Sequence, residues 1–210
     1  MLLAFDTATP FVTVALHDGD RVVGEQRSEQ QMKHGEQLAP LIDDVLRTAG
    51  VARQQLTGIA VGTGPGPFTG LRVGLVTART LSLVLGIPAY GVCSLDVIAL
   101  EAADRLEVDF VVASDARRKE VYLATYDAHG ARTSGPVVDR PGALATDRPA
   151  AGQGAELYPD AFPHAVAPAL PSAAWLARGV VEERVEVTGP EPRYLRRPDA
   201  VAPGERKRVS

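Results

Sequence analysis

The sequence predicts an α/β protein in which mixed sheets are flanked by helices. An apolar meander turned at Asp18-Gly19 opens the chain, strand-like and helix-like segments then alternate, and the pattern partly restarts near Asp109. Asp-Gly between apolar runs is a strong hairpin signal. An antiparallel meander that is followed by strand–helix units indicates a mixed sheet with helices packed on it.

The first predicted elements are three short strands and an amphipathic helix. Residues 2–5 form an apolar run that ends at Asp6, and residues 11–16 and 21–25 form the hairpin. Apolar residues then recur at the helical spacing i, i+3, i+4 and i+7. These residues are Leu38, Leu41, Ile42, Val45, Leu46 and Ala49. Gly50 is predicted to end this helix.

A glycine-rich turn joins the next strand, 59–61, to a second helix. Residues 62–74 read GTGPGPFTGLRVG. Glycines allow positive φ and close backbone approach, and Thr69 is predicted to cap the helix. Such a turn suits an anion. The weak candidate contacts for an anion or nucleotide are Asp6, Thr7, Gly64, Gly66, Thr69 and Arg72. A tight connection without a ligand is the favoured alternative, because the Gly-Lys-Ser/Thr of a P-loop is missing and Pro67 lacks an N–H.

The second helix, about 70–86, carries a row of small residues at every fourth position. They are Gly70, Gly74, Ala78, Ser82 and Gly86. Residues at i and i+4 lie above one another on a helix, so this row lets another backbone come close. Most other positions are large and apolar, which indicates burial on more than one side. Its own sheet can cover one side, and either a neighbouring helix or a partner protein would cover the other.

The second half predicts a weaker copy of the first. A strand at 89–92 and a helix from Leu95 precede a new strand–turn–strand pattern over 110–126. Residues 136–171 are dense in Pro and Gly and predict loops with short strands, and 172–181 predicts a helix. We therefore expect a duplicated architecture. The predicted domains are 1–106 and 107–198, with a flexible basic tail at 199–210.

Composition limits the function classes. The chain has 210 residues, 45% hydrophobic and 23% charged, with a net charge of −4, so no overall positive field draws it to nucleic acid. The single Cys93 suits a reducing compartment. We find no signal peptide, no run of 18 apolar residues and no zinc-ligand spacing, and we expect a cytoplasmic protein without a membrane or metal. The end Arg193–Ser210 has six basic and two acidic residues; a solvated end is favoured over a weak RNA-phosphate or partner contact.

Six segments in order carry a resemblance to a known family. They are Leu3–Thr9, His34–Ile42, Gly64–Gly74, Asp115–Tyr122, Gly152–Ala155 and Pro192–Arg196. In these segments the chain resembles the bacterial TsaB (YeaZ-like) family of tRNA threonylcarbamoyladenosine biosynthesis. The glycine-rich segment is the specific one and the later segments match loosely. Gly35 and Pro67 stand where the family usually has serines.

The resemblance implies an actin/sugar-kinase/Hsp70-like (ASKHA) fold with two related domains, each with a mixed sheet flanked by helices. It implies an accessory subunit without catalysis of its own, which lacks the metal-binding His pair of the catalytic subunit. The implied partners are a TsaD-like catalytic subunit in a heterodimer, a TsaE-like ATPase, and tRNA through the complex. That complex transfers a threonylcarbamoyl group to N6 of adenosine 37 in tRNAs that read ANN codons. No cofactor would bind this chain tightly, ATP would be used by the wider complex, and a homodimer of the chain alone stays open.

The family docks its partner through the two helices of the first domain, which here are about 35–49 and 70–86. The interface residues that this implies are Leu38, Leu41, Ile42, Val45, Gly70, Leu71, Gly74, Leu75, Ala78 and Ser82.

Two enzyme hypotheses remain as alternatives. An ATPase or kinase-like enzyme of the same fold needs a second glycine-containing phosphate turn, whereas Asp115–Lys119 offers Arg and Lys. A peptidase-like protein needs an activated nucleophile or a metal, and neither GxSxG nor HExxH is present. We therefore predict no catalytic residue. Asp6 and Asp115 are expected to be structural strand-end residues, and His34 an exposed residue at a helix start.

Overall fold

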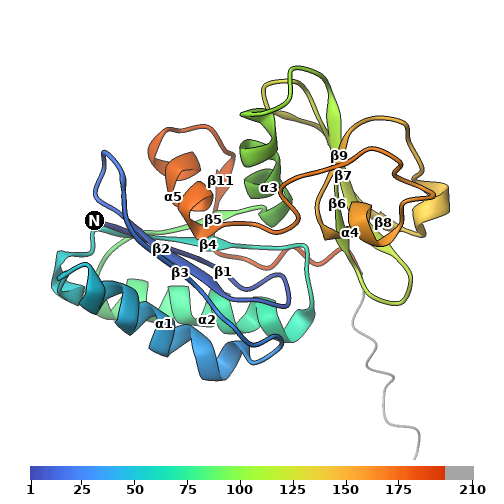
Figure 1. The fold of residues 1–210 in the computed structure, drawn as a ribbon. Coiled ribbons are helices and arrows are strands. Elements are labelled where there is room, and N and C mark those ends of the chain that lie inside the picture. Colours follow the sequence, from blue (N-terminus) through green and yellow to red (C-terminus); the bar gives the residue numbers. More distant parts are fainter. Residues whose placement is uncertain (197–210) are drawn as a thin grey trace, which may run out of the picture.

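The computed structural model describes residues 1–196, which form two mixed sheets with helices packed on them (Figure 1). The predicted tail at 199–210 lies outside the described residues.

The first sheet has the strand order β11-β5-β4-β1-β2-β3. Strands β1, β2 and β3 form an antiparallel meander, β4 runs parallel to β1, and β5 runs parallel to β4. The bounds are β1 Leu2–Asp6, β2 Thr13–His17, β3 Val22–Arg27, β4 Gly58–Gly62, β5 Ala89–Val92 and β11 Val187–Thr188.

The second sheet repeats this plan with the order β10-β9-β6-β7-β8. Strands β6, β7 and β8 form the meander, β9 is parallel to β6, and β10 is parallel to β9. The bounds are β6 Phe110–Asp115, β7 Val121–Tyr126, β8 Arg132–Asp139, β9 Ala150–Ala151 and β10 Ala165–Val166. Because both halves place their first five strands in the same order, the predicted ASKHA-type fold class with two related mixed sheets is confirmed.

Five α-helices cover these sheets within the described residues. They are α1 His34–Thr48, α2 Phe68–Leu85, α3 Ser94–Ala103, α4 Gln153–Leu157 and α5 Ala173–Val181, with short 3-10 turns η1 Arg53–Gln55 and η2 Pro141–Ala143. Helices α1 and α2 lie side by side on one face of the first sheet, and α5 lies on the other face (Figure 1). Helix α4 packs on β6, as does α3, which also contacts α5. Both α5 and β11 come from the predicted second domain yet pack on the first sheet, while the boundary near residue 106 stays a prediction.

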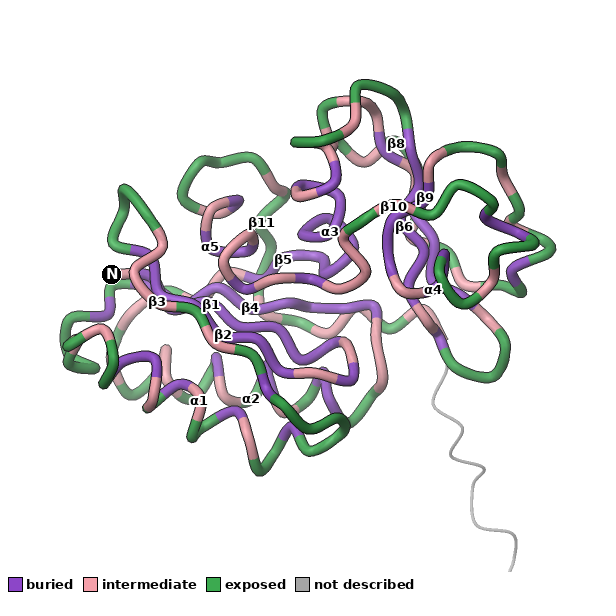
Figure 2. Tube along the Cα trace, viewed as in Figure 1, coloured by how far each residue is buried: buried purple, intermediate pink, exposed green. Residues whose placement is uncertain are grey.

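Period-two alternation along β1 divides the core of the first half. Leu3 and Phe5 point toward α1 and α2, where they meet Leu38 and Leu71. Leu2 and Ala4 point the other way and pack against residues of α5, including Leu176 and Ala177. Full burial of such a leucine stabilises the fold by about 1.5–3 kcal/mol. In Figure 2 the central strands are buried, whereas the outward turns of α1 and α2 are exposed.

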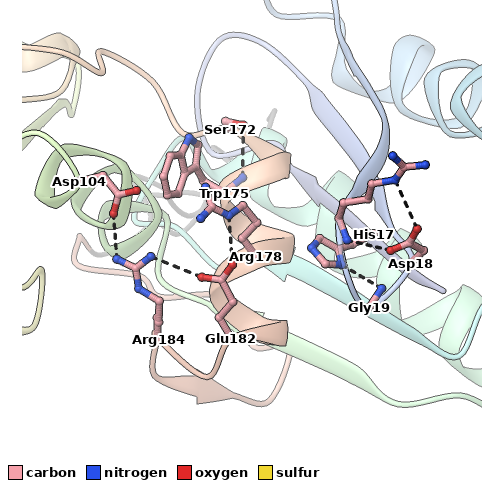
Figure 3. Close-up of polar contacts among 10 residues, drawn as sticks. His17, Asp18, Gly19, Asp104, Ser172, Trp175, Arg178, Glu182 and Arg184 are labelled. Carbon is pink, nitrogen blue, oxygen red and sulfur yellow. Dashed lines mark hydrogen bonds and ion pairs between the residues drawn. The ribbon is translucent and has the colours of Figure 1, made fainter.

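The ends of α3 and α5 are tied together by ion pairs. Arg184 contacts Asp104, which follows α3, at 3.0 Å and Glu182, which follows α5, at 3.4 Å (Figure 3). The hydrogen bond that Arg184 donates to the Asp104 carboxylate is the main cause that raises the pKa of Arg184. At the other end of α5, the Ser172 hydroxyl accepts the N–H groups of Ala174 and Trp175 as an N-cap. These contacts hold α5 against α3 and the first sheet.

One predicted helix cap is correct and one is wrong. Gly50 follows α1 with φ +66°, the left-handed conformation expected at a helix end. Thr69, in contrast, does not cap α2, because the helix begins one residue earlier at Phe68 and Pro67 occupies the cap position without a side-chain hydrogen bond. The proline ring fixes φ near the helical value, which favours this earlier start.

Candidate functional site

The glycine-rich turn packs on the loop between β1 and β2. A Cβ added at Gly66 would overlap the carbonyl oxygen of Ala8, and one at Gly70 would lie 2.5 Å from the carbonyl oxygen of Thr7. A Cβ at Gly74 would overlap the Thr7 hydroxyl. The predicted close backbone approach is therefore present, and the group that comes close belongs to the chain itself.

Asp6 and Thr7 lie buried at this contact and are hydrogen-bonded. The Asp6 carboxylate accepts the Ala8 N–H at 2.7 Å and the Ser94 hydroxyl at 2.6 Å. The Thr7 hydroxyl donates to the carbonyl oxygen of Gly70 at 2.9 Å. Burial raises the pKa of Asp6, while the hydrogen bonds from Ser94 and Ala8 oppose that shift. Asp6 thus links β1 to the start of α3, in agreement with the structural role predicted for it.

His34 is buried, contrary to the prediction of an exposed residue. Its Nε2 lies 2.6 Å from the carbonyl oxygen of Thr9, and its ring packs beside Gly70. The absence of a side chain at Gly70 leaves the space that the ring fills. His34 therefore braces the β1–β2 loop against α2 and does not face solvent as a free base.

The predicted anion contacts do not converge on a cavity. The space between the halves that is lined by Thr9, Pro67, Asp115 and Arg117 holds only about 10 Å³. Gly64 donates its N–H to Ser94. The remaining two candidates, Thr69 and Arg72, are exposed, and the Arg72 guanidinium stacks over the Phe68 ring at 3.6 Å. No group of three or more His, Cys, Asp or Glu that could hold a metal occurs within residues 1–196.

The corresponding loop of the second half, between β6 and β7, has a different conformation. Asp115 accepts the Arg117 N–H at 2.8 Å, as Asp6 accepts that of Ala8. Arg117, Arg118 and Lys119 then have φ values of 61°, 56° and 61°. The left-handed conformation costs an L-residue about 1–2 kcal/mol. The turn therefore lacks the glycines of a phosphate cradle and carries exposed basic side chains instead.

Most of the predicted interface residues lie inside the molecule. Only Leu41 and Ser82 of that set are partly exposed, while the following are buried: Leu38, Ile42, Val45, Gly70, Leu71, Gly74, Leu75 and Ala78. Three members of the small-residue row, Gly70, Gly74 and Ala78, pack within the first half, whereas Ser82 is half-buried and Gly86 is exposed. The row therefore meets its own chain at three of its five positions, and its use by a partner stays a prediction.

The side of α2 that faces outward carries exposed large apolar residues together with Arg72, Arg79 and Thr80. Val76, Leu83 and Val84 are 60%, 84% and 73% exposed, and we call these three residues the α2 outer face. Their spacing of seven and eight residues places them on one side of the helix. Helix α2 is long and apolar enough to cross a membrane, and 28% of it is buried inside the protein. Its packing on the sheet makes it a core helix with one exposed side. The same spacing was available in the sequence and could have identified this face.

An open cleft of about 580 Å³ lies between β3 and α1. Its lining includes Leu41 and Gln37. Both amide atoms of Gln37 are buried and make no hydrogen bond to the described residues. A buried unpaired polar group costs about 1–3 kcal/mol. A docking protein that forms hydrogen bonds with the Gln37 amide would remove this cost.

Comparisons with known proteins agree on one family. The model described as "TsaD: tRNA N6-adenosine threonylcarbamoyltransferase" matches residues 22–175. An uncharacterized protein of Mycobacterium tuberculosis is 41% identical over 204 residues, 95% of this chain and 93% of that protein. The tRNA threonylcarbamoyladenosine biosynthesis protein TsaB of Escherichia coli is 36% identical over 126 residues, 60% of this chain and 54% of that protein. The solved structure of YeaZ from Pseudomonas aeruginosa superposes with a TM-score of 0.78 at 32% identity, over 92% of this chain and 99% of that one.

Proposed function

The chain belongs to the TsaD/YeaZ family of tRNA N6-adenosine threonylcarbamoyltransferase proteins, and we propose that it is a non-catalytic partner subunit of such a transferase. It forms a heterodimer with a TsaD-like catalytic subunit, and a TsaE-like ATPase joins them. The complex adds the threonylcarbamoyl group to N6 of adenosine 37 in tRNAs reading ANN codons. We place this work in the cytoplasm, without a membrane, and with ATP used by the complex and no cofactor bound tightly to this chain.

The observation that carries the proposal is the α2 outer face. Contiguous exposed apolar surface marks an interaction site more often than scattered apolar residues do. Val76, Leu83 and Val84 lie on one side of a helix whose other side is already packed in the core. Covering a Val or Leu side chain yields about 1.5–3 kcal/mol, so a helix from a related subunit could dock here. Two copies of this chain could use the same face, which keeps a homodimer available when the partner is absent.

The site geometry supports a role without independent catalysis. The side chains of Asp6 and Thr7 form hydrogen bonds within this chain, and the His34 ring lies against the carbonyl oxygen of Thr9. Ligand pockets typically enclose about 300–1,000 Å³, whereas the space lined by Thr9, Pro67, Asp115 and Arg117, where the two strand-end loops meet, holds about 10 Å³.

Depletion followed by complementation tests the proposal in the cell. We expect depletion of the chain to lower threonylcarbamoyladenosine in tRNA, as measured by nucleoside mass spectrometry. Wild-type protein should restore it, and Val76→Asp/Leu83→Asp should restore it poorly because two charges would be buried at the interface. An unchanged nucleoside level after verified depletion, without a substitute paralogue, contradicts the proposal. So does ATP hydrolysis or group transfer by the isolated chain that Asp6→Asn abolishes.

A further inference from the structure

The turn between β6 and β7 holds three consecutive basic residues in a backbone conformation that suits them poorly. Arg117, Arg118 and Lys119 have φ values of 61°, 56° and 61°, and all three are exposed. Glycine and asparagine adopt this left-handed conformation more readily than arginine or lysine does. Backbone strain of this kind gathers at functional sites. Three basic residues in a conformation that favours glycine therefore mark this turn as a candidate site.

The strained turn is closed by three hydrogen bonds. The N–H of Ala116 donates to the carbonyl oxygen of Glu120 at 3.0 Å, and the N–H of Glu120 donates to that of Arg117 at 3.1 Å. The N–H of Arg117 donates to the Asp115 carboxylate at 2.8 Å. The backbone therefore presents the basic side chains from a fixed position, which lowers the ordering cost of binding.

The basic turn contacts a fourth basic residue, Arg196, at the end of the described part of the chain. Arg196 donates to the carbonyl oxygen of Ala116 at 3.2 Å and forms an ion pair with Glu120. The guanidinium of Arg117 also lies 3.4 Å from the Asp115 carboxylate. The four basic residues outnumber these two carboxylates, so the turn is positive on a chain whose net charge is −4.

We propose that Arg117, Arg118 and Lys119 bind the phosphate backbone of tRNA, an inference that rests on the proposed function. Arginine forks match phosphate oxygens in bidentate fashion. Residues 116–120 have no exposed apolar side chain, whereas protein interfaces have an apolar core. This favours nucleic acid over an acidic protein surface. The turn contains no aromatic residue to stack on a base, so it positions tRNA without reading its sequence.

The test uses the full chain, alone and with its catalytic subunit, and unfractionated tRNA as the probe. The variant Arg117→Asn/Arg118→Asn/Lys119→Asn removes the charges and keeps a residue type that tolerates the conformation. The matched control Arg53→Gln/Arg140→Gln/Arg148→Gln removes the same charge from exposed arginines elsewhere. Binding is measured over a salt series of about 50–200 mM, and folding is followed by thermal melt.

We expect the turn variant to bind tRNA at least about tenfold more weakly at the low-salt end, with the slope of log K against log salt smaller by about 2–3. Its melting temperature should be unchanged or higher, and the control should shift binding much less. Equal tRNA binding by wild type and turn variant, alone and in the complex, overturns the proposal. Lost binding of the catalytic subunit with unchanged tRNA binding also overturns it and assigns the turn to a protein surface. Failure of wild-type chain to form the heterodimer instead contradicts the proposed function and leaves the tRNA comparison readable on the chain alone.

Discussion

The two halves of the molecule share one plan and use the first loop of that plan in opposite ways. In each half the first strand ends in an aspartate, Asp6 or Asp115, that accepts an N–H two residues further on, at 2.7 Å and 2.8 Å. In the first half the loop that follows is buried under α2. In the second half it stands exposed with three basic residues. The loop of a repeated hairpin can therefore pack in the core in one copy and be exposed to solvent in the other.

The second element of the plan, a glycine-rich strand-to-helix connection, is retained in both halves. A Cβ at Gly66 would overlap the carbonyl oxygen of Ala8, and one at Gly152 would overlap that of Ala113. The helix that follows has 18 residues in the first half and five in the second. Only the long helix α2 has enough length to pack on its sheet and still present a bare side. Close backbone packing at a glycine is thus common to both halves, against the β1–β2 loop in the first and against strand β6 in the second, while the proposed partner surface lies in the first.

The largest effect is expected from a substitution that disrupts the packing of α2 on the β1–β2 loop. Gly74→Leu should destabilise the fold, because the new side chain would occupy the position of the Thr7 hydroxyl. Overpacking costs about 1–3 kcal/mol, and at the upper end the melting temperature falls by about 6–12 °C. Gly142→Leu is the control, since a Cβ there meets nothing within 4 Å. A Gly74→Leu protein that melts like wild type would contradict the packing described here.

A smaller effect is expected when exposed valines in the two halves are truncated, and it should differ between the halves. Val84 on α2 and Val137 on β8 are 73% and 45% exposed. Val84→Ala removes two methyl groups from the proposed interface. This should weaken binding of the catalytic subunit by about 1.5 kcal/mol, which is a roughly tenfold higher Kd. Val137→Ala should leave this affinity unchanged. Binding measured by calorimetry decides, with thermal melts to show that both variants fold; equal losses from both would remove the distinction between the halves.

The smallest effect concerns Asp6, the strand-end aspartate of the first half. The folded-state pKa of Asp6 is raised by burial, so the native state holds its proton to higher pH than the unfolded chain does. Stability from this carboxyl is therefore lost as pH rises from the unfolded pKa of about 3.9 through the folded value. Asp6→Asn removes that titration, so its stability relative to wild type should improve as the pH rises above about 3.9. Denaturant melts at several pH values measure this, and a stability difference that does not change with pH would contradict burial as the cause.

Local patterns in the sequence determined the elements and their order. Period-two alternation, the Asp-Gly turn and the 3.6-residue apolar periodicity placed the strands and α1, and glycines at 50 and 66 marked a helix end and a close approach. The restart near Asp109 predicted a duplicated architecture, and the structure shows the same strand order in both sheets. These features follow from the sequence because each depends on neighbours within a few residues.

Only the tertiary structure decided which surfaces meet. Helix α2 is apolar nearly all round, so periodicity could not choose between its small-residue row and its outer face, and packing on β4 and Thr7 placed Gly74 inside and Leu83 outside. His34 is buried because Gly70, distant in sequence, leaves space for its ring. Helix α5 covers the first sheet although it follows the strands of the second. Each of these outcomes rests on contacts between residues far apart in the chain, and their free energies are not encoded in any local pattern.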